Sequence, residues 1–178
     1  MLSSRQAASR AVNFFVADVG ARYLHVLGVI VWIGHNWANV ISRPRYHRVL
    51  PADPPDAIRA VFMAAARREH GFFRYASLVV LSSGLFMLWN RGMLGAALRL
   101  QGVAAPIGIG IWLGLIMAAN LWFVLWPHQK KVLGFMPAPL EERLRCTRIT
   151  FLSSRTNTIL SIPTLFFMIV GAHGATLF

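Results

Sequence analysis

Four stretches of the sequence contain no charged residue, and they divide the chain into apolar blocks. They are Tyr23–Ser42, Tyr75–Asn90, Leu100–Gln129 and Thr156–Phe178. A helix that crosses a bilayer needs roughly 20 mostly apolar residues. The first, third and fourth stretches reach this length, and the second reaches it when Phe72 and Phe73 are added. Because the period-2 alternation of a β-barrel strand is absent, the pattern predicts four transmembrane helices.

These helices are expected over residues 23–41, 72–90, 106–126 and 155–175 of a single membrane domain that covers residues 1–178. The fold class predicted is therefore all-α, an integral membrane four-helix bundle. Pro127 is expected to end the third helix, because proline disrupts a helix interior, and Pro163 is expected to kink the fourth. Residues 11–21 are predicted to form a short interfacial helix ahead of the first span. A cytoplasmic helix is expected over residues 56–70.

The basic residues indicate the orientation of the bundle. The chain has 18 Lys and Arg against six Asp and Glu, and its formal net charge is +12. Of these basic residues, 13 lie in the two connections 43–74 and 130–155. Positive residues remain on the cytoplasmic side, so we expect a bacterial inner-membrane protein with both termini in the periplasm. The charge distribution fits topology and anionic lipid rather than nucleic acid.

Polar residues recur along one face of the first span. His25, Gly28, Trp32, His35 and Asn39 are spaced by three and four residues, which places them on one stripe of a helix. Polar groups in a membrane helix normally face the bundle interior. Two interpretations of this stripe remain open. Gly28 leaves room beside His25 for a flat ligand, or it only allows a neighbouring helix to approach closely.

A second histidine is expected at the same depth as His25. Arg43 marks the inner end of the first span and Arg155 that of the fourth, and His25 and His173 each lie 18 residues outward from these arginines. At 1.5 Å per residue, both lie about 27 Å from the cytoplasmic surface. Two histidines at one depth are what a bis-histidine haem b requires. Zinc is disfavoured, because no third and fourth ligand is evident at that depth.

The remaining histidines have weaker claims to a functional role. His35 and His128 are reserve candidates for iron, although hydrogen bonding within the bundle is the simpler interpretation of His35. His70 and His128 are expected at the cytoplasmic ends of their helices, where an interfacial role is the simpler interpretation. His47 lies among arginines in a loop and receives no role.

Other chemistry finds little support in the sequence. All six acids lie outside the predicted spans, and no Ser–His–Asp set or phosphate-binding loop is present. Cys146 is the single cysteine, so an internal disulfide and a Cys-x-x-Cys-His attachment for c-type haem are both excluded. Catalytic residues are not identified, and whether the protein is an enzyme stays open.

Three blocks of the sequence resemble a known family. "RYLHVLGVIVWIG" at 22–34, "NLWFVLWPHQKKVLG" at 120–134 and "SSRTNTILSIPTLFFMIVGAH" at 153–173 are similar to the N-terminal membrane domain of bacterial membrane-bound urate oxidases. That family is similar in layout to copper-resistance-type membrane proteins and to four-helix protoporphyrinogen oxidases, for which haem b has been proposed. His25 and His173 fall at family histidine positions. The chain departs from the family pattern at His128, where asparagine is usual, and at His35.

The resemblance implies an inner-membrane redox protein that binds haem b and passes electrons. His25 and His173 would be the axial ligands, Trp32 and Gly28 would line the porphyrin, and Arg22 would pair with a propionate. The large urate oxidases carry a C-terminal cytochrome c domain, which the printed chain lacks, so we expect a stand-alone four-helix form. A cofactor-free accessory subunit and a urate-oxidising enzyme are the alternatives. The expected partners are the lipid bilayer and further membrane subunits or copies of this chain.

Overall fold

The computed structural model describes residues 4–68 and 71–174, with side chains described from residue 12 onward, and the described part contains helices and no strand. The helices are α1 Ser4–Ser42, α2 Pro55–Arg68, α3 Phe72–Asn90, α4 Leu94–Leu98, α5 Ala105–Ala119, α6 Trp126–Leu133 and α7 Leu140–Ala172. A 3-10 turn at Gly102–Ala104 precedes α5, and a π-helical segment, η2, spans Asn120–Leu125. Four of the helical stretches are long and apolar enough to cross a membrane. The all-α, four-helix membrane prediction is therefore confirmed.

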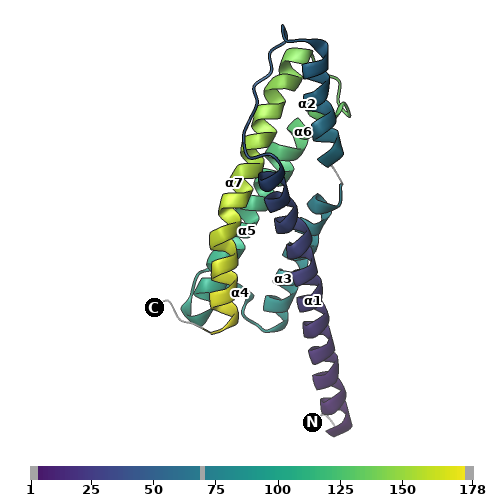
Figure 1. Cartoon of the computed structure of the whole chain (residues 1–178). Helices are drawn as coiled ribbons and strands as arrows, with labels where there is room; N and C mark the ends of the chain where they lie inside the picture. Colours follow the sequence, from purple (N-terminus) through teal and green to yellow (C-terminus); the bar gives the residue numbers. More distant parts are fainter. Residues whose placement is uncertain (1–3, 69–70, 175–178) are drawn as a thin grey trace.

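Two antiparallel helix pairs form the bundle, one made of α1 and α3 and the other of α5 and α7 (Figure 1). Glycine allows close approach in both pairs. A Cβ at Gly28 of α1 would lie 2.8 Å from Val80 Cγ2 of α3, and one at Gly171 of α7 would lie 2.7 Å from Ile107 Cβ of α5. In membranes, where lipid is as apolar as the side chains, such small-residue contacts drive helix association.

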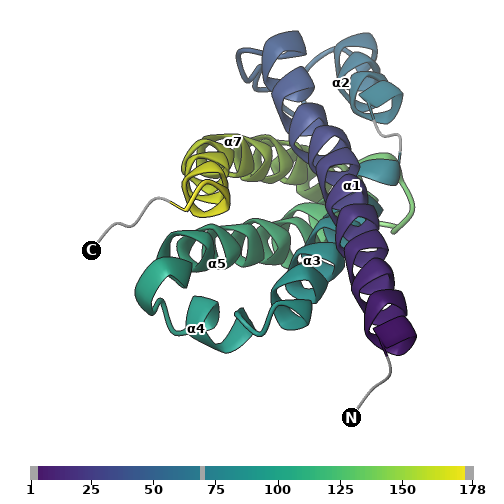
Figure 2. The same ribbon diagram turned by 90° about the horizontal axis from the view of Figure 1, so that it is seen from below.

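The two pairs meet most closely towards one end of the bundle. A core cluster of Trp32, Ile33, Phe73, Ala76, Val80, Met117, Ala118, Leu121 and Leu125 joins α1, α3, α5 and η2. At the opposite end α4 connects α3 to α5, as Figure 2 shows, around a second cluster that includes Leu88, Ala97 and Ile111. We call these two ends the α2 end and the α4 end. Seen along the bundle, the first turns of α1 lie well apart from the last turns of α7.

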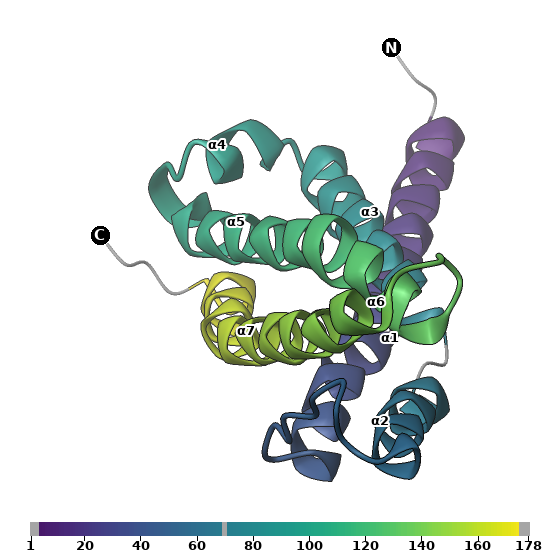
Figure 3. The same cartoon turned by 90° about the horizontal axis from the view of Figure 1, so that it is seen from above.

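Most basic residues gather at the α2 end. Figure 3 shows α2, α6 and the first turns of α7 together there, whereas α1 begins and α7 ends at the α4 end. The Arg143 guanidinium of α7 stacks over the Phe62 ring of α2 at 4.1 Å. The two basic connections thus share one end, as the charge pattern requires. The side of the membrane that this end faces stays a prediction.

The N-terminal region is one continuous helix. Residues 11–21 were expected as a separate interfacial helix, but they form part of α1, which runs unbroken from Ser4 to Ser42. No proline separates the two segments, the helix runs through Gly20, and the carboxylate of Asp18 is neutralised by arginines rather than ending the helix. Whether these turns lie at a membrane interface stays a prediction.

The prediction that Pro127 ends the third span is wrong. The helix continues through the proline to Leu133 and ends at Gly134, whose φ of 82° forms a left-handed cap. The preceding residues, 120–125, are π-helical. Proline lacks an N–H and its ring collides with the carbonyl four residues earlier, and the wider π turn accommodates both effects. The fourth span similarly runs through Pro163 as part of α7.

A polar cluster holds the π-helical segment against α7. Asn120 Nδ2 donates to Ser153 O at 2.9 Å and to Asn157 Oδ1 at 2.8 Å, and Ser153 Oγ donates to Asn120 Oδ1 at 2.9 Å. Asn157 Nδ2 completes the cluster by donating to Met117 O at 3.1 Å. The amides therefore satisfy polar groups that lipid would leave without partners.

Candidate functional site

A polar cavity of about 90 Å³ lies where α1, α2, α6 and α7 meet near the α2 end. Its polar lining consists of His35, Asn36, Asn39, Arg43, Arg68, Gln129, Thr150, Ser154 and Arg155. Phe73, Leu125 and Phe151 contribute apolar surface. Since most ligand sites combine apolar walls with a few convergent polar groups, this cavity is the strongest candidate site in the described part of the chain.

Two arginines are bound together at the cavity. The Arg155 guanidinium of α7 donates through Nη2 to the carbonyl of Arg43, the residue after α1. Both guanidinium groups lie over the Phe151 ring, with Cζ to centroid distances of 5.5 Å for Arg43 and 4.6 Å for Arg155. Burial lowers the pKa of Arg43, and the neighbouring charge of Arg155 lowers it further. The contact joins α1 to α7 and concentrates positive charge.

The third cavity arginine comes from α2. Arg68 is the last residue of that helix and lines the cavity opposite α7. None of the acids that the structure describes lines the cavity. Those acids are Asp18, Asp53, Asp56, Glu141 and Glu142, whereas Glu69 lies outside the described residues. Three cations thus converge on a space to which no described carboxylate contributes.

His35 is held in a fixed orientation on the cavity wall. Its ring stacks on Phe73 of α3, with centroids 4.1 Å apart and planes 7° from parallel. Asn39 Nδ2 donates to His35 Nε2 at 2.9 Å. An amide nitrogen can only donate, so Nε2 accepts and the ring proton lies on Nδ1. This bond occupies Nε2 of His35, which was a reserve candidate for iron.

Asn36 carries an unsatisfied donor at the same cavity. Its side chain is 2% exposed, and in the part of the chain that the structure describes its Nδ2 has no hydrogen-bond partner. A buried amide without a partner costs free energy. Such an exception calls for an explanation, for example a bound group that accepts the hydrogen bond.

The predicted stripe on the first span faces the bundle interior and packs mainly against α3. His25 Nδ1 lies 2.9 Å from Val80 O and 3.3 Å from Ser83 Oγ. The His25 ring also lies against Gly84, where a Cβ would be 3.0 Å from Cε1. Because the Val80 carbonyl can only accept, His25 carries its proton on Nδ1 and leaves Nε2 as the free lone pair.

Two other stripe residues pack without room for a flat group beside them. Val80 of α3 fills the space beside Gly28, which corresponds to the close-approach interpretation of this glycine. Trp32 is 2% exposed within the core, and its Nε1 has no hydrogen-bond partner among the described residues. Trp32 lies on the same helix face as His25 and closer to the polar cavity.

The remaining predicted site residues bond to partners other than one another. His173 ends α7 and is exposed, with Nδ1 2.8 Å from Ile169 O. Arg22 Nη2 donates to Asp18 Oδ2 at 3.1 Å, and His128 Nδ1 lies 2.7 Å from Val124 O of its own helical run. In the described part of the chain no hydrogen bond joins any of them to His25. His70 lies outside the described residues. Among the residues that the structure describes, no group of three His, Cys, Asp or Glu is arranged to hold a metal ion.

Sequence reasoning missed the residues that line the cavity. Arg43 and Arg155 were considered only as markers of helix ends, and Asn36 was overlooked beside His35. In "WPHQKK" the sequence pattern indicated His128 as a candidate, whereas the structure places the adjacent Gln129 in the cavity wall. The sequence did contain a signal for this cavity. Asn36 and Gln129 are uncharged polar residues near the ends of two different spans, a pattern that favours a shared polar space.

The fold and the cavity define a polytopic helical membrane domain with a partly buried basic site. The urate oxidase N-terminal family matches residues 67–178, from the last turn of α2 through the whole of α7. The match covers more than half of the chain, and the chain therefore belongs to this family. It does not include α1, which carries His25. No curated protein and no solved structure matches the chain.

Proposed function

We propose that this domain binds haem b and passes electrons, with His25 and His173 as axial ligands near the α4 end. The support lies in the register of the two helices that carry these histidines. Arg155 of α7 contacts the carbonyl of Arg43 at the end of α1. His25 and His173 each lie 18 residues from these contacting residues. Eighteen residues are about five full turns, so each histidine lies on the same helix face as its arginine, and the two histidines lie equally far from the arginine contact.

The tautomer of both imidazole rings supports the same proposal. His25 and His173 each direct Nδ1 towards a backbone carbonyl, that of Val80 and that of Ile169 respectively. Histidines that bind metals usually donate the second ring N–H in this way, which fixes the tautomer and orients the free nitrogen. This orientation of both imidazoles supports the haem b proposal, and the group would supply one-electron chemistry when bound.

Other residues would hold and shield the group. Arg22 uses one amino group on Asp18, and the other donors of its guanidinium suit a propionate. Trp32, packed in the core on the same helix face, would form the apolar floor of the site below His25. Gly28 contributes by allowing α3 to support the His25 helix.

A visible absorption spectrum of the purified protein tests the proposal. Two imidazole ligands give low-spin, six-coordinate iron. His25→Ala and His173→Ala should each convert the spectrum to high-spin or lose the haem, whereas His47→Ala, an exposed loop position, should leave it unchanged. An unchanged low-spin spectrum in both ligand variants would rule out this pair. A colourless protein from a haem-replete host would favour the cofactor-free accessory subunit.

We further propose that the α2 end faces the cytoplasm of a bacterial inner membrane and that both termini lie in the periplasm. The gathering of basic residues at the α2 end supports this orientation. Further membrane subunits or copies of this chain would cover part of the apolar surface of α1, where Tyr23 and Ile30 are largely exposed.

A further inference from the structure

An apolar groove lies beside the polar cavity, between α1 and α2. The groove has a volume of about 410 Å³ and is lined by Ser42, Ala60, Met63, Ala64, Arg67 and Arg68. Arg68 lines both spaces. A charged space and an apolar one therefore lie side by side at the place where the span of α1 ends.

The charge of the cavity selects an anion. Arg43, Arg68 and Arg155 line it, and no acid that the structure describes accompanies them. Like charges at short range repel one another, and a low local dielectric strengthens the repulsion. An anion in the cavity relieves this repulsion, and guanidinium groups bind phosphate oxygens with matched geometry.

Asn36 supplies an independent indication of a bound acceptor. Its side chain is 98% buried at the cavity wall, and in the described residues its Nδ2 finds no acceptor. An oxygen of a bound anion would satisfy this donor. The arginines alone would not require an occupant, because guanidinium groups can also be solvated, but a buried amide N–H without a partner is rare.

The volume of the cavity limits the size of the anionic group. The cavity volume of about 90 Å³ is several times the roughly 10–15 Å³ that a single water needs by this measure. A tetrahedral oxyanion of the phosphate type fits this volume. The groove beyond Arg68 is several times larger and suits an acyl chain.

From these features we infer that the cavity binds the phosphate of an anionic phospholipid, with Arg43, Arg68, Arg155 and Asn36 around the oxyanion and an acyl chain in the groove. Phosphate as a free ion offers the same chemistry to the arginines. Only a lipid accounts for the adjoining apolar groove and for its opening beside Ser42, the last residue of the α1 span. The inference is independent of the proposed haem.

Native mass spectrometry of the full chain, released from nanodiscs, tests this inference. The nanodiscs contain phosphatidylglycerol mixed with phosphatidylcholine. We expect one phosphatidylglycerol to remain bound. Arg68→Gln should weaken its retention about fivefold, since one basic residue near a lipid surface contributes about that factor. Arg59→Gln, which removes the same charge from the exposed side of α2, should leave retention unchanged.

A second variant distinguishes the loss of lipid binding from misfolding of the chain. Ala64→Trp fills the groove without changing charge, and it should lower retention of the lipid while leaving the helix content by circular dichroism unchanged. Equal loss in Arg59→Gln and Arg68→Gln would overturn the inference, because it would indicate only general surface charge. Thermal stabilisation by inorganic phosphate without selective lipid retention would overturn the lipid as the source of the oxyanion.

Discussion

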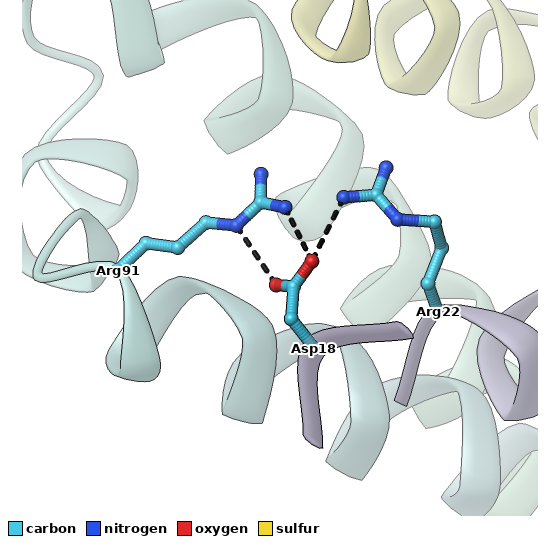
Figure 4. Close-up of polar contacts among 3 residues, drawn as sticks. All are labelled: Asp18, Arg22 and Arg91. Atoms are coloured by element: carbon cyan, nitrogen blue, oxygen red, sulfur yellow. Dashed lines mark hydrogen bonds and ion pairs between the residues drawn. The ribbon is translucent and has the colours of Figure 1, made fainter. Parts of the chain in front are cut away.

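Arg91, the residue after α3, donates two parallel hydrogen bonds to the carboxylate of Asp18 of α1 (Figure 4). Nε lies 2.9 Å from Oδ1 and Nη2 lies 2.7 Å from Oδ2. Arg22 adds a third bond to the same carboxylate. The Asp18 carboxylate holds the pKa of the Arg91 guanidinium above its ordinary value. The pair joins the N-terminal half of α1 to the end of α3 near the α4 end, close to the proposed haem site.

We predict that Asp18→Asn and Arg91→Gln each destabilise the protein by about 1–2 kcal/mol. A fully buried pair would cost more when broken, but the Arg91 side chain is 39% exposed, so solvent screens the interaction. Thermal melting in detergent measures the effect. Arg22→Gln, at a side chain that is 51% exposed, should cost less. Additive losses in the double variant would contradict a direct Asp18–Arg91 coupling.

Gly171→Ala should lower stability through overpacking. The new methyl would lie 2.7 Å from Ile107 Cβ and 2.8 Å from Ile107 N, and backbone atoms cannot yield as a flexible side chain can. The expected cost is about 1–3 kcal/mol. Gly114→Ala in α5 is the matched control, because its methyl meets nothing within 4 Å. That control should be neutral or stabilising by about 0.5–1 kcal/mol. Equal melting temperatures for the two variants would refute the close contact.

Asn157→Ala should loosen the π-helical segment from α7. The substitution removes the bonds to Asn120 and Met117 O, and interhelical bonds in membranes contribute about 0.6 to 1.7 kcal/mol each. We expect a loss of about 1–2 kcal/mol by thermal melting. Thr156→Ala, which removes only an exposed bond to Leu152 O of its own helix, should have little effect. A loss in Thr156→Ala as large as in Asn157→Ala would argue against the cluster.

The orientation of the bundle can be measured by cysteine labelling. After Cys146→Ser, a membrane-impermeant reagent added to whole spheroplasts should label Leu2→Cys and spare Met136→Cys. Met136 is exposed in the connection before α7, so permeabilised cells should label it readily and provide the control. Labelling of Met136→Cys but not Leu2→Cys in intact spheroplasts would reverse the proposed topology.

Local pattern was sufficient for the spans and for the stripe on α1. A span is set by the thickness of the bilayer, which a count of apolar residues measures directly. The side of a helix that faces inward follows from the cost of polar groups in lipid. The stripe from His25 to Asn39 could therefore be oriented before any neighbouring helix was known.

Tertiary structure decided what that stripe meets and where the basic cavity forms. His25 packs on Val80 and Gly84 of α3, and Arg155 reaches Arg43 across 112 residues of sequence. Periodicity within one helix carries no information about such partners. The π-helical segment ahead of Pro127 likewise meets another helix, where Asn120 donates to Ser153 and Asn157. The sequence by itself determined four spans and their inward faces, whereas close packing between distant helices determined the site.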